Sequence, residues 1–442
     1  MHTILVAGAG KSSGYLIDYL LGNASRYKWK IVIADAHVRH LNEKLRGTSY
    51  GEAVEVDITD AEKRGALVQR ADFVVSLLPP ALHILVARDC LKFKRSLITS
   101  SYMSDEMQAL DAEVKEAGLM FMCEMGLDPG IDHMTASKII HSIQRVAGSI
   151  TSFKSYCGGL IAPESDNNPW HYKFTWNPMN VVVAGKGGAK YLASGKQVEV
   201  PYEKMFEPSK KIKIGDMGNY AFYPNRDSYR YLGLYDVPEI KTFLRATLRH
   251  SSFIKGWHAV VLLGLTKEDD RVERVGATYS GWLRAATGCP ADANLHSHVA
   301  SLLGVAETDK SISLLNWLGL FNNTPIADGV KTSAEILLDV LQSKWGMAPD
   351  DRDMVLMQHE FEYNHKGRKV KLTSTMSVIG EGRDHSAMAK TVGLPMGILA
   401  KLVLTGKIQP PMGVVIPTMP AVYRPVLTEL GHFGITFTDE VE

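Results

Sequence analysis

The first 35 residues of the chain contain an apolar run, closely spaced glycines, a helical pattern and a second apolar run that ends on an acid. The segment begins Thr3-Ile-Leu-Val-Ala-Gly8-Ala-Gly10-Lys-Ser-Ser-Gly14 and continues to Ile31-Val-Ile-Ala-Asp35. This order predicts a strand, a tight turn, a helix and a second parallel strand, the unit that holds a dinucleotide in doubly wound α/β proteins. Gly8 permits the turn, and Gly10 lets the backbone approach a pyrophosphate. A helix beginning near Lys11 then offers free N–H groups to the phosphates.

The glycine pattern departs from G-x-G-x-x-G at its third glycine. Position 13 is serine, and Gly14 follows one residue late. Ser13 is small enough for the helix to pack closely on the strand, so we interpret the segment as a variant of the pattern. Asp35 follows Gly14 by 21 residues, where its carboxylate accepts hydrogen bonds from both ribose hydroxyls and repels a 2′-phosphate. The sequence therefore favours NAD over NADP.

Composition limits the classes of protein that the chain can belong to. With 442 residues, 45% hydrophobic and 22% charged, it has ordinary globular composition and is long enough for two or three domains. A net charge of +1 provides no overall field for nucleic acid or an anionic membrane. We find no apolar run long enough to cross a bilayer and no room for a signal peptide, so we expect a cytoplasmic protein.

Neither disulfides nor metals are indicated by the cysteines and histidines. The four cysteines, Cys90, Cys123, Cys157 and Cys289, are widely separated and form no C-x-x-C. His296 and His298 lie two residues apart and do not share a helix face. We therefore expect no metal site.

Strand and helix patterns alternate through the first 125 residues, which predicts a parallel, doubly wound sheet. The expected helices are 39–46, 61–68, 83–90 and 105–117, and the expected strands are 53–56, 73–78, 96–99 and 119–123. Ligands bind beyond the carboxyl ends of such strands. Those ends are Gly8–Ser13, Asp35, Asp57, Leu78-Pro-Pro, Thr99–Tyr102 and Glu124–His133.

A second domain is expected after about residue 130. Runs at 150–157, 181–183 and 360–373 indicate strands, and amphipathic runs such as 239–248, 295–303 and 333–345 indicate helices. We expect a dinucleotide-binding domain at 1–130, a mixed-sheet α/β domain for substrate and dimerisation at 131–236 and 346–394, and a helical insertion at 237–345. Residues from about 395 to 442 are expected to fold back onto the first domain.

Two polar segments at the predicted strand ends carry candidate chemistry. The hydroxyls of Thr99, Ser100 and Ser101 suit a ribose, a nicotinamide amide or a substrate carboxylate, although such residues are also common in turns. Tyr102 adds an aromatic hydroxyl. The run Glu124-Met-Gly-Leu-Asp128-Pro-Gly-Ile-Asp132-His133 places three carboxylates and an imidazole around a turn. We assign Asp132 to capping of a helix that starts near His133, and Asp128 to catalysis or binding.

Candidates beyond the first domain are a cysteine and two arginines. Cys157 precedes two glycines at a predicted strand end, and a buried hydrophobic role is the common alternative to a reactive thiol. Arg226 and Arg249 each lie in a polar setting. Together they suit a substrate with several carboxylates, whereas singly each is typical of a surface ion pair.

With these residues in hand, the chain resembles the saccharopine reductase family, the glutamate-forming saccharopine dehydrogenases of lysine metabolism. The resemblance runs nearly end to end. It is carried by Leu77-Leu-Pro, Thr99-Ser-Ser-Tyr, Glu124-Met-Gly-Leu-Asp-Pro-Gly-Ile-Asp-His, Ser155-Tyr-Cys-Gly-Gly, Tyr172-Lys-Phe-Thr-Trp176, Tyr223-Pro-Asn-Arg-Asp-Ser, Thr247-Leu-Arg249 and Ser386-Ala-Met-Ala-Lys390.

The resemblance implies an N-terminal Rossmann domain, a larger α/β domain with a helical part, a homodimer, and reversible conversion of saccharopine to glutamate and 2-aminoadipate 6-semialdehyde. By motif, it implies cofactor contacts from Ala9, Gly10, Lys11, Ser12, Asp57, Ile58, Leu78, Pro79 and the loop from Leu127 through Gly130 to His133, with Trp176 nearby. The substrate residues implied are Ser101, Tyr102, Asp128, Arg226, Thr247, Leu248 and Arg249, with Cys157 and Trp176 near them as well.

In this reaction hydride leaves the carbon beside a secondary amine, and water hydrolyses the resulting imine. A base must take the amine proton, and Asp128, Tyr102 and Cys157 are the candidates. Fungal members that use NADP carry an arginine just after the second strand, where this chain has Ala34-Asp35-Ala36-His37. That departure supports NAD, while His37 or Arg39 leaves NADP open.

Two alternatives remain. A relative acting on carboxynorspermidine needs extra acids for a cationic tail, so Arg226 and Arg249 favour saccharopine. A non-catalytic dinucleotide-binding sensor is disfavoured by Tyr102, Asp128 and the two arginines.

Overall fold

Two structural units make up the computed structural model, which describes residues 1–208, 210–273, 277–326 and 330–442. Unit 1 comprises Met1–Gly148 and Ser377–Phe437, and unit 2 comprises Ser149–Met376 and Thr438–Glu442. The expected boundary near residue 130 differs from this division, because helix α7 (Ile131–Arg145) packs on α16 (Pro420–His432) within unit 1. His141 of α7 bonds the Tyr423 hydroxyl of α16 at 3.0 Å.

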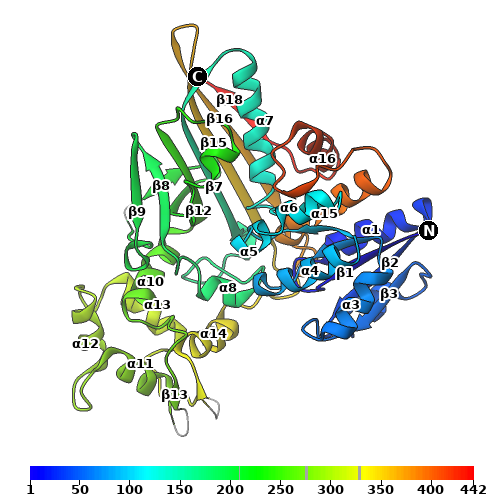
Figure 1. Ribbon diagram of the computed structural model, residues 1–442. Helices are drawn as coiled ribbons and strands as arrows, with labels where there is room; N and C mark the ends of the chain where they lie inside the picture. Colours follow the sequence, from blue (N-terminus) through cyan, green and yellow to red (C-terminus); the bar gives the residue numbers. More distant parts are fainter. Residues whose placement is uncertain (209, 274–276, 327–329) are drawn as a thin grey trace. The chain divides into compact units, whose positions relative to one another are not determined.

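A seven-stranded parallel sheet forms the centre of unit 1 (Figure 1). Its order is β17-β6-β5-β4-β1-β2-β3, so the chain reverses direction across the sheet between β1 and β4. Apolar runs such as Ile4–Val6 are buried on both faces, as expected for parallel strands covered by helices. The strands are β1 (His2–Ala7), β2 (Trp29–Asp35), β3 (Gly51–Glu55), β4 (Phe73–Ser76), β5 (Ser96–Thr99), β6 (Met120–Met122) and β17 (Gly413–Val415).

The remaining helices of unit 1 follow the alternating pattern, with one break. The helix expected at 105–117 is two helices, α5 and α6, separated at Ala109-Leu110. These helices are α1 (Gly14–Tyr27), α2 (Leu41–Leu45), α3 (Ala61–Arg70), η1 (Pro80–Leu82), α4 (His83–Lys92), α5 (Asp105–Gln108), α6 (Asp111–Glu116) and α15 (Ala387–Leu404).

Helix α15 is long and apolar enough to cross a membrane by length and composition, contrary to the expectation that the chain has no such apolar run. Most of it is buried inside the fold, however, and it packs on α1. Gly393 and Gly397 allow the close approach: a Cβ on Gly393 would lie 2.9 Å from the backbone nitrogen of Leu16, and one on Gly397 would lie 2.9 Å from the Tyr19 ring. The apolar length of α15 is thus used to cover α1, the helix that follows the glycine turn.

A nine-stranded mixed sheet forms the centre of unit 2. Its main path is β10-β11-β12-β7-β15-β16-β18, and β8 pairs with both β12 and β9. The strands are β7 (Ser149–Ile161), β8 (Ala189–Ala193), β9 (Lys196–Val200), β10 (Lys211–Lys213), β11 (Asn219–Pro224), β12 (Thr242–Arg249), β15 (Asp353–His365), β16 (Arg368–Ile379) and β18 (Thr438–Val441).

Three expectations for this part of the chain are wrong. The segment 239–248, expected to be a helix, contains strand β12, whose β-branched and aromatic residues suit a sheet. The single strand expected at 360–373 is the hairpin of β15 and β16. Its turn residues Lys366 and Gly367 have φ of 50° and 75°, as a type I′ turn requires. The strand expected at 181–183 lies instead in a short helix capped by Asn177.

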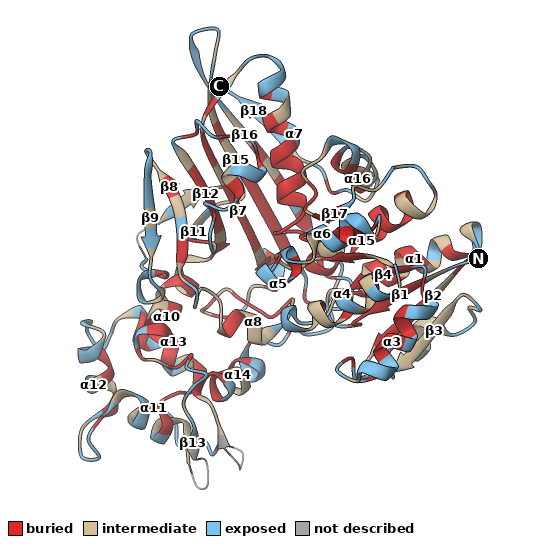
Figure 2. Ribbon diagram, in the orientation of Figure 1, coloured by how far each residue is buried: buried red, intermediate tan, exposed pale blue. Residues whose placement is uncertain are grey.

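A helical region follows β12, and residues 274–276 and 327–329 of the expected insertion lie outside the described residues. Its core is rich in tryptophan, with Phe253 stacked on Trp257 at 5.5 Å. Figure 2 shows the buried inner faces and exposed outer faces of these helices. The elements of unit 2 outside the main sheet are η2 (Pro163–Ser165), α8 (Pro178–Val182), η3 (Tyr202–Lys204), α9 (Tyr231–Leu234), α10 (Ser251–Leu262), β13 (Val272–Glu273), α11 (Tyr279–Thr287), α12 (Leu295–Leu302), α13 (Lys310–Leu318), β14 (Val330–Lys331) and α14 (Ser333–Lys344).

Candidate functional site

The glycine turn lies between β1 and α1 at the carboxyl edge of the sheet in unit 1. Gly8 has φ of 99°, and a Cβ there would lie 2.9 Å from the carbonyl carbon and oxygen of Leu77. Gly10 has no atom within 4 Å of the position of a Cβ, so its backbone remains accessible to a ligand. Helix α1 begins at Gly14 rather than near Lys11, because residues 10–13 form a turn closed by the bond from Ser13 N–H to the Gly10 carbonyl. These features fit the diphosphate of a dinucleotide.

Asp35, the last residue of β2, reaches back to this turn. Its Oδ2 accepts a hydrogen bond from Ala9 N–H at 2.6 Å, and its Oδ1 accepts one from His37 N–H at 2.9 Å. The carboxylate is thus held beside the glycine turn, where the ribose of a bound dinucleotide lies in this fold.

Other predicted cofactor residues lie along the same edge. The pKa of Lys11 is lowered, first by burial and then by the positive charge of Arg383. Asp57 accepts bonds from both the backbone and the hydroxyl of Thr59, which lower its pKa. Ile58 is buried, whereas Ser12 is half-buried.

The ends of β4 and β5 place a group of hydroxyls around His83. Ser76 Oγ lies 2.8 Å from His83 Nδ1, and Ser101 Oγ lies 2.8 Å from His83 Nε2. Thr99 Oγ1 lies 3.3 Å and 3.2 Å from the two ring nitrogens. Burial lowers the pKa of His83 to about 4. Among the predicted residues of these loops, Pro79 is exposed and Leu78 and Ser100 are half-buried.

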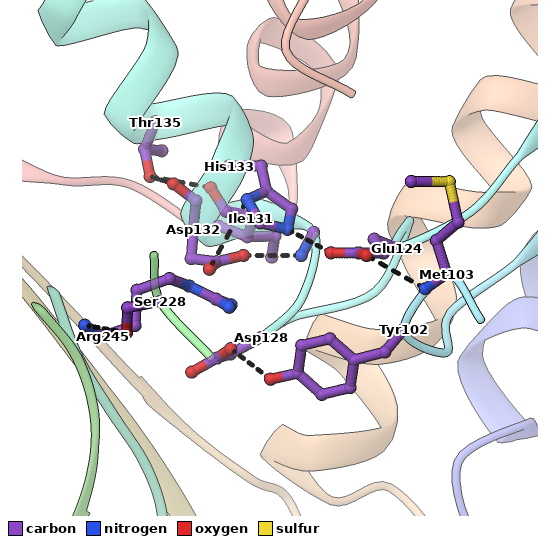
Figure 3. A network of polar contacts seen from close by, with 11 residues as sticks. Tyr102, Met103, Glu124, Asp128, Ile131, Asp132, His133, Thr135, Ser228 and Arg245 are labelled. Carbon is purple, nitrogen blue, oxygen red and sulfur yellow. Dashed lines mark hydrogen bonds and ion pairs between the residues drawn. The ribbon is translucent and has the colours of Figure 1, made fainter. Parts of the chain in front are cut away.

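Tyr102 and Asp128 come together from two loops of unit 1, as Figure 3 shows. The Tyr102 hydroxyl donates to Asp128 Oδ1 at 3.2 Å. Asp128 belongs to a tight turn in which Gly126 N–H donates to the Pro129 carbonyl at 2.9 Å, and the Asp128–Pro129 peptide bond is cis. A Cβ on Gly130 would clash with Gly126 at 2.1 Å, and Leu127 is buried. The sequence placed both polar residues at strand ends, and the structure joins them.

A buried network holds these two loops in place (Figure 3). Glu124 Oε1 accepts from Met103 N–H at 3.0 Å, and Glu124 Oε2 lies 2.7 Å from His133 Nε2. Asp132 Oδ1 accepts from Gly130 N–H at 2.6 Å, so Asp132 bonds the start of α7, although Gly130 is the cap and the helix begins at Ile131. Glu124, Asp132 and His133 are at most 1% exposed. Glu124 thus ties the Tyr102 loop to the Asp128 loop.

In unit 2, Cys157 and Thr247 are paired in register on neighbouring strands β7 and β12. Arg249, two residues after Thr247, points to the same face of β12. Its guanidinium lies 5.3 Å from the centre of the Tyr172 ring. Trp176 Nε1 donates to the Tyr172 hydroxyl at 3.3 Å. Several predicted substrate residues therefore lie together, and Trp176, expected near both the cofactor and the substrate residues, lies beside them in unit 2.

Arg226 and Leu248 are placed differently from this group. The backbone N–H of Asn225 donates to the Arg245 carbonyl, which puts Asn225 about 13 Å from Arg249 along the strand, at roughly 3.3 Å per residue, and Arg226 lies one residue farther on. The side chain of Leu248 packs in the apolar core on the other face of β12, so Leu248 can contact a ligand through its backbone.

Sequence reasoning missed Arg245, which is 1% exposed with its guanidinium 4.6 Å from the Tyr231 ring centre. Reading β12 as a strand would have placed Arg245, Thr247 and Arg249 on one face. His83 and Ser76 were also missed. The sequence feature that could have indicated them is a polar residue at the end of β4, Ser76, and another at the start of α4, His83.

Two family models cover most of the chain. The saccharopine dehydrogenase NADP-binding domain matches residues 4–122, and the saccharopine dehydrogenase C-terminal domain matches residues 126–435. The chain belongs to the saccharopine dehydrogenase family. It is thus an oxidoreductase with a nicotinamide-dinucleotide-binding domain of Rossmann type, and the expected α/β fold is confirmed.

Two fungal relatives match over nearly their whole length, and a third matches over about half of its length. Saccharopine dehydrogenase [NADP(+), L-glutamate-forming] of Schizosaccharomyces pombe is 31% identical, covering 100% of this chain and 99% of the relative. The Saccharomyces cerevisiae protein of the same name is 33% identical, covering 98% and 97%. The mitochondrial alpha-aminoadipic semialdehyde synthase of Bos taurus is 34% identical over 99% of this chain, which corresponds to 47% of that protein.

A solved structure agrees with this membership. Apo histidine-tagged saccharopine dehydrogenase (L-Glu forming) from Saccharomyces cerevisiae superposes with a TM-score of 0.87 at 31% identity, over 100% of both chains. The family resemblance derived from the motifs is therefore confirmed.

Proposed function

We propose that this chain interconverts saccharopine with L-glutamate and 2-aminoadipate 6-semialdehyde. Saccharopine, an oxidised nicotinamide dinucleotide and water give glutamate, the semialdehyde, the reduced dinucleotide and a proton. The dinucleotide supplies the hydride acceptor when bound. Support comes from the full-length similarity to relatives named for this activity and from the Tyr102–Asp128 pair at the dinucleotide-binding edge.

The residues of the chain must bind three carboxylates and take a proton from the secondary amine. Arg249 is the observation that carries the anionic substrate: it is 4% exposed, its Nη1 donates to the Leu248 carbonyl, and its buried Nε has no hydrogen-bond partner among the described residues. A buried guanidinium with an unused N–H suits a carboxylate ligand. Arg226 is the second proposed carboxylate ligand.

Proton transfer is assigned to Asp128 in this proposal. Its carboxylate accepts a bond from Tyr102 and so has a defined orientation. Cys157 is the competing candidate. An Asp128→Asn variant should lower kcat by about 100-fold at the pH optimum if Asp128 is the base. A Cys157→Ser variant is the matched comparison, and a larger loss there would move the role to the thiol.

The activity is tested by steady-state oxidation of saccharopine with NAD and NADP in parallel assays, with carboxynorspermidine as the competing substrate. An Arg249→Lys variant keeps the charge, and Arg249→Ala removes it. We expect the alanine variant to raise KM for saccharopine by about 100-fold, since a charged hydrogen bond contributes up to about 3 kcal/mol. Absence of reduction of either dinucleotide in the wild type would falsify the proposed reaction, and faster turnover of carboxynorspermidine would replace the substrate.

For the dinucleotide itself we propose NAD as the preferred form, although the relatives are named for NADP(+). The support is Asp35, whose carboxylate is held at the glycine turn by Ala9 and His37. A charge there repels a 2′-phosphate by roughly 1 to 4 kcal/mol at about 4 Å, which favours NAD by about 10-fold or more.

An Asp35→Asn variant tests this preference because it removes the charge and keeps an acceptor for the backbone. The ratio of kcat/KM for NAD to that for NADP should fall about 10-fold. Glu55→Gln is the control, since Glu55 is the register partner of Asp35 on β3 and is exposed. A wild-type preference for NADP would overturn this part of the proposal and leave the reaction intact.

A further inference from the structure

Three side chains of unit 1 form a hydroxyl–imidazole chain: Ser76 at the end of β4, His83 at the start of α4, and Ser101 after β5. The two contacts join Ser76 Oγ to His83 Nδ1 and His83 Nε2 to Ser101 Oγ, each at 2.8 Å. Ser76 is fully buried, His83 is 4% exposed, and Ser101 is half-buried at the carboxyl edge of the sheet. The chain thus runs from the core of the sheet outward to Ser101.

The imidazole in the middle is electrically neutral. Burial disfavours its charged form and lowers its pKa to about 4. A neutral imidazole carries one proton, so one ring nitrogen donates and the other accepts. His83 therefore carries no charge between the two serines. The ring nitrogen that holds its proton determines which serine donates and which accepts.

The buried end sets that direction. Among the described residues, the hydrogen-bond partner of the Ser76 side chain is His83 Nδ1. A fully buried hydroxyl donates its proton where an acceptor is available, so Ser76 donates and Nδ1 accepts. The ring proton then lies on Nε2 and is donated to Ser101 Oγ at 2.8 Å, since Ser101 Oγ is nearer to Nε2 than Thr99 Oγ1 is at 3.2 Å. Because Ser101 Oγ accepts this bond, the proton of the Ser101 hydroxyl is available to donate to another acceptor.

We propose that His83 is a positioning residue that holds the Ser101 hydroxyl as a hydrogen-bond donor toward a carboxylate of the substrate. A carboxylate only accepts hydrogen bonds, so a serine held as a donor is matched to it. The neighbouring residue Tyr102 reaches Asp128, which places the polar edge next to Ser101. This inference rests on the proposed function, since it names saccharopine as the source of the carboxylate.

The test compares His83→Leu with His83→Gln. Leucine fills the space and removes both hydrogen bonds, whereas glutamine accepts with its oxygen and donates with its nitrogen. We expect His83→Leu to raise KM for saccharopine about 10-fold or more, with KM for the dinucleotide changed less than about 2-fold. His83→Gln should recover most of that loss. Thermal unfolding and dinucleotide binding of each variant establish that it is folded.

A double-variant cycle separates positioning from general damage. If His83 acts through Ser101, the His83→Leu/Ser101→Ala protein has the same KM for saccharopine as Ser101→Ala alone. Ser76→Ala should raise KM by about 2- to 3-fold, because the ring loses the donor that sets its tautomer. Ser137→Ala is the matched control, since the Ser137 hydroxyl is buried on α7 and has no hydrogen-bond partner among the described residues.

The other possible outcomes of these experiments contradict either the role of His83 or the proposed function. Additive losses in the double variant, an unchanged KM in His83→Leu, or a rise in KM for the dinucleotide instead of saccharopine would overturn the role of His83 while the reaction stands. A wild-type protein that neither oxidises nor binds saccharopine would overturn the proposed function, and this inference with it.

Discussion

Two buried histidines at the same edge of the unit 1 sheet have opposite kinds of partners. His83 contacts hydroxyls on both ring nitrogens, 2.8 Å from Ser76 and 2.8 Å from Ser101. His133 faces two carboxylates, with Nε2 2.7 Å from Glu124 and Nδ1 3.8 Å from Asp132. Both rings are at most 4% exposed, so burial alone does not distinguish them.

This difference shows that the hydrogen-bond partners of a buried histidine, rather than its burial alone, determine its role. Hydroxyls do not compensate the desolvation of a charged ring, and His83 is accordingly neutral near pH 7 and can only orient a neighbour. Carboxylates bring charge into the core and must be bonded there, so His133 and Glu124 fasten two loops to each other. One histidine adjusts a hydroxyl, and the other stabilises the loops that carry Tyr102 and Asp128.

The largest expected effect is on the carboxylate side of this comparison. Glu124→Ala removes the acceptor of the bonds from Met103 N–H and His133, and we expect the free energy of unfolding to fall by about 3 kcal/mol or more. Glu124→Gln keeps one acceptor and should lose about half as much. Denaturant unfolding measures both. A loss below about 1 kcal/mol in the alanine variant would show that the network does not hold the loops.

The second expected effect is acid sensitivity on the hydroxyl side. The pKa of His83 is about 4 in the folded chain and about 6.5 when unfolded, so between these values the unfolded chain binds the extra proton. Stability due to this group is complete above pH 6.5 and decreases as the pH falls toward 4. At pH 5 the loss from this residue is roughly 2 kcal/mol relative to pH 7.

The measurement is denaturant unfolding at pH 7 and pH 5 for the wild type and His83→Gln. The variant has no group that titrates in this range at position 83, so its decrease between the two pH values should be smaller by that amount. Equal decreases in the two proteins would contradict the neutral, buried state of His83.

Most strands of unit 1 could be predicted because they are apolar runs that end at a glycine, an acid, a proline or a run of hydroxyl residues, whereas β17 was not expected. A strand that is buried on both faces can be recognised from its continuous apolar run, without knowing which strands lie beside it. The predicted strand 96–99 matches β5. Asp35 and the Gly8 turn followed from spacing alone. In unit 2, the run 239–248 has apolar residues compatible with both helix and strand, and pairing with β7 and β11 in the sheet decides for a strand.

The polar clusters could not be predicted because their members come from separate elements. His83 was read as the first residue of a helix, and its partners lie at the ends of β4 and β5, which are neighbours only through the sheet order. Arg245 was hidden by the incorrect helix at 239–248, since its alternation with Thr247 and Arg249 has meaning only in a strand. Register and sheet order, which a single sequence does not contain, bring these side chains together.

The smallest expected effect on stability, and the sharpest test of the division of roles, is at Tyr102. Its hydroxyl donates to Asp128 Oδ1 at 3.2 Å in a half-buried setting, so Tyr102→Phe should lower the free energy of unfolding by about 0.5 kcal/mol. Tyr220→Phe in unit 2 is a matched control, since its hydroxyl donates to the Met217 carbonyl at 3.1 Å. If the Glu124–His133 network carries stability and the outer edge carries chemistry, Tyr102→Phe should reduce kcat/KM for saccharopine about 10-fold while the control leaves it unchanged. A Tyr102→Phe protein that loses 2 kcal/mol or more of stability, or that keeps full kcat/KM, would place Tyr102 with the structural network instead.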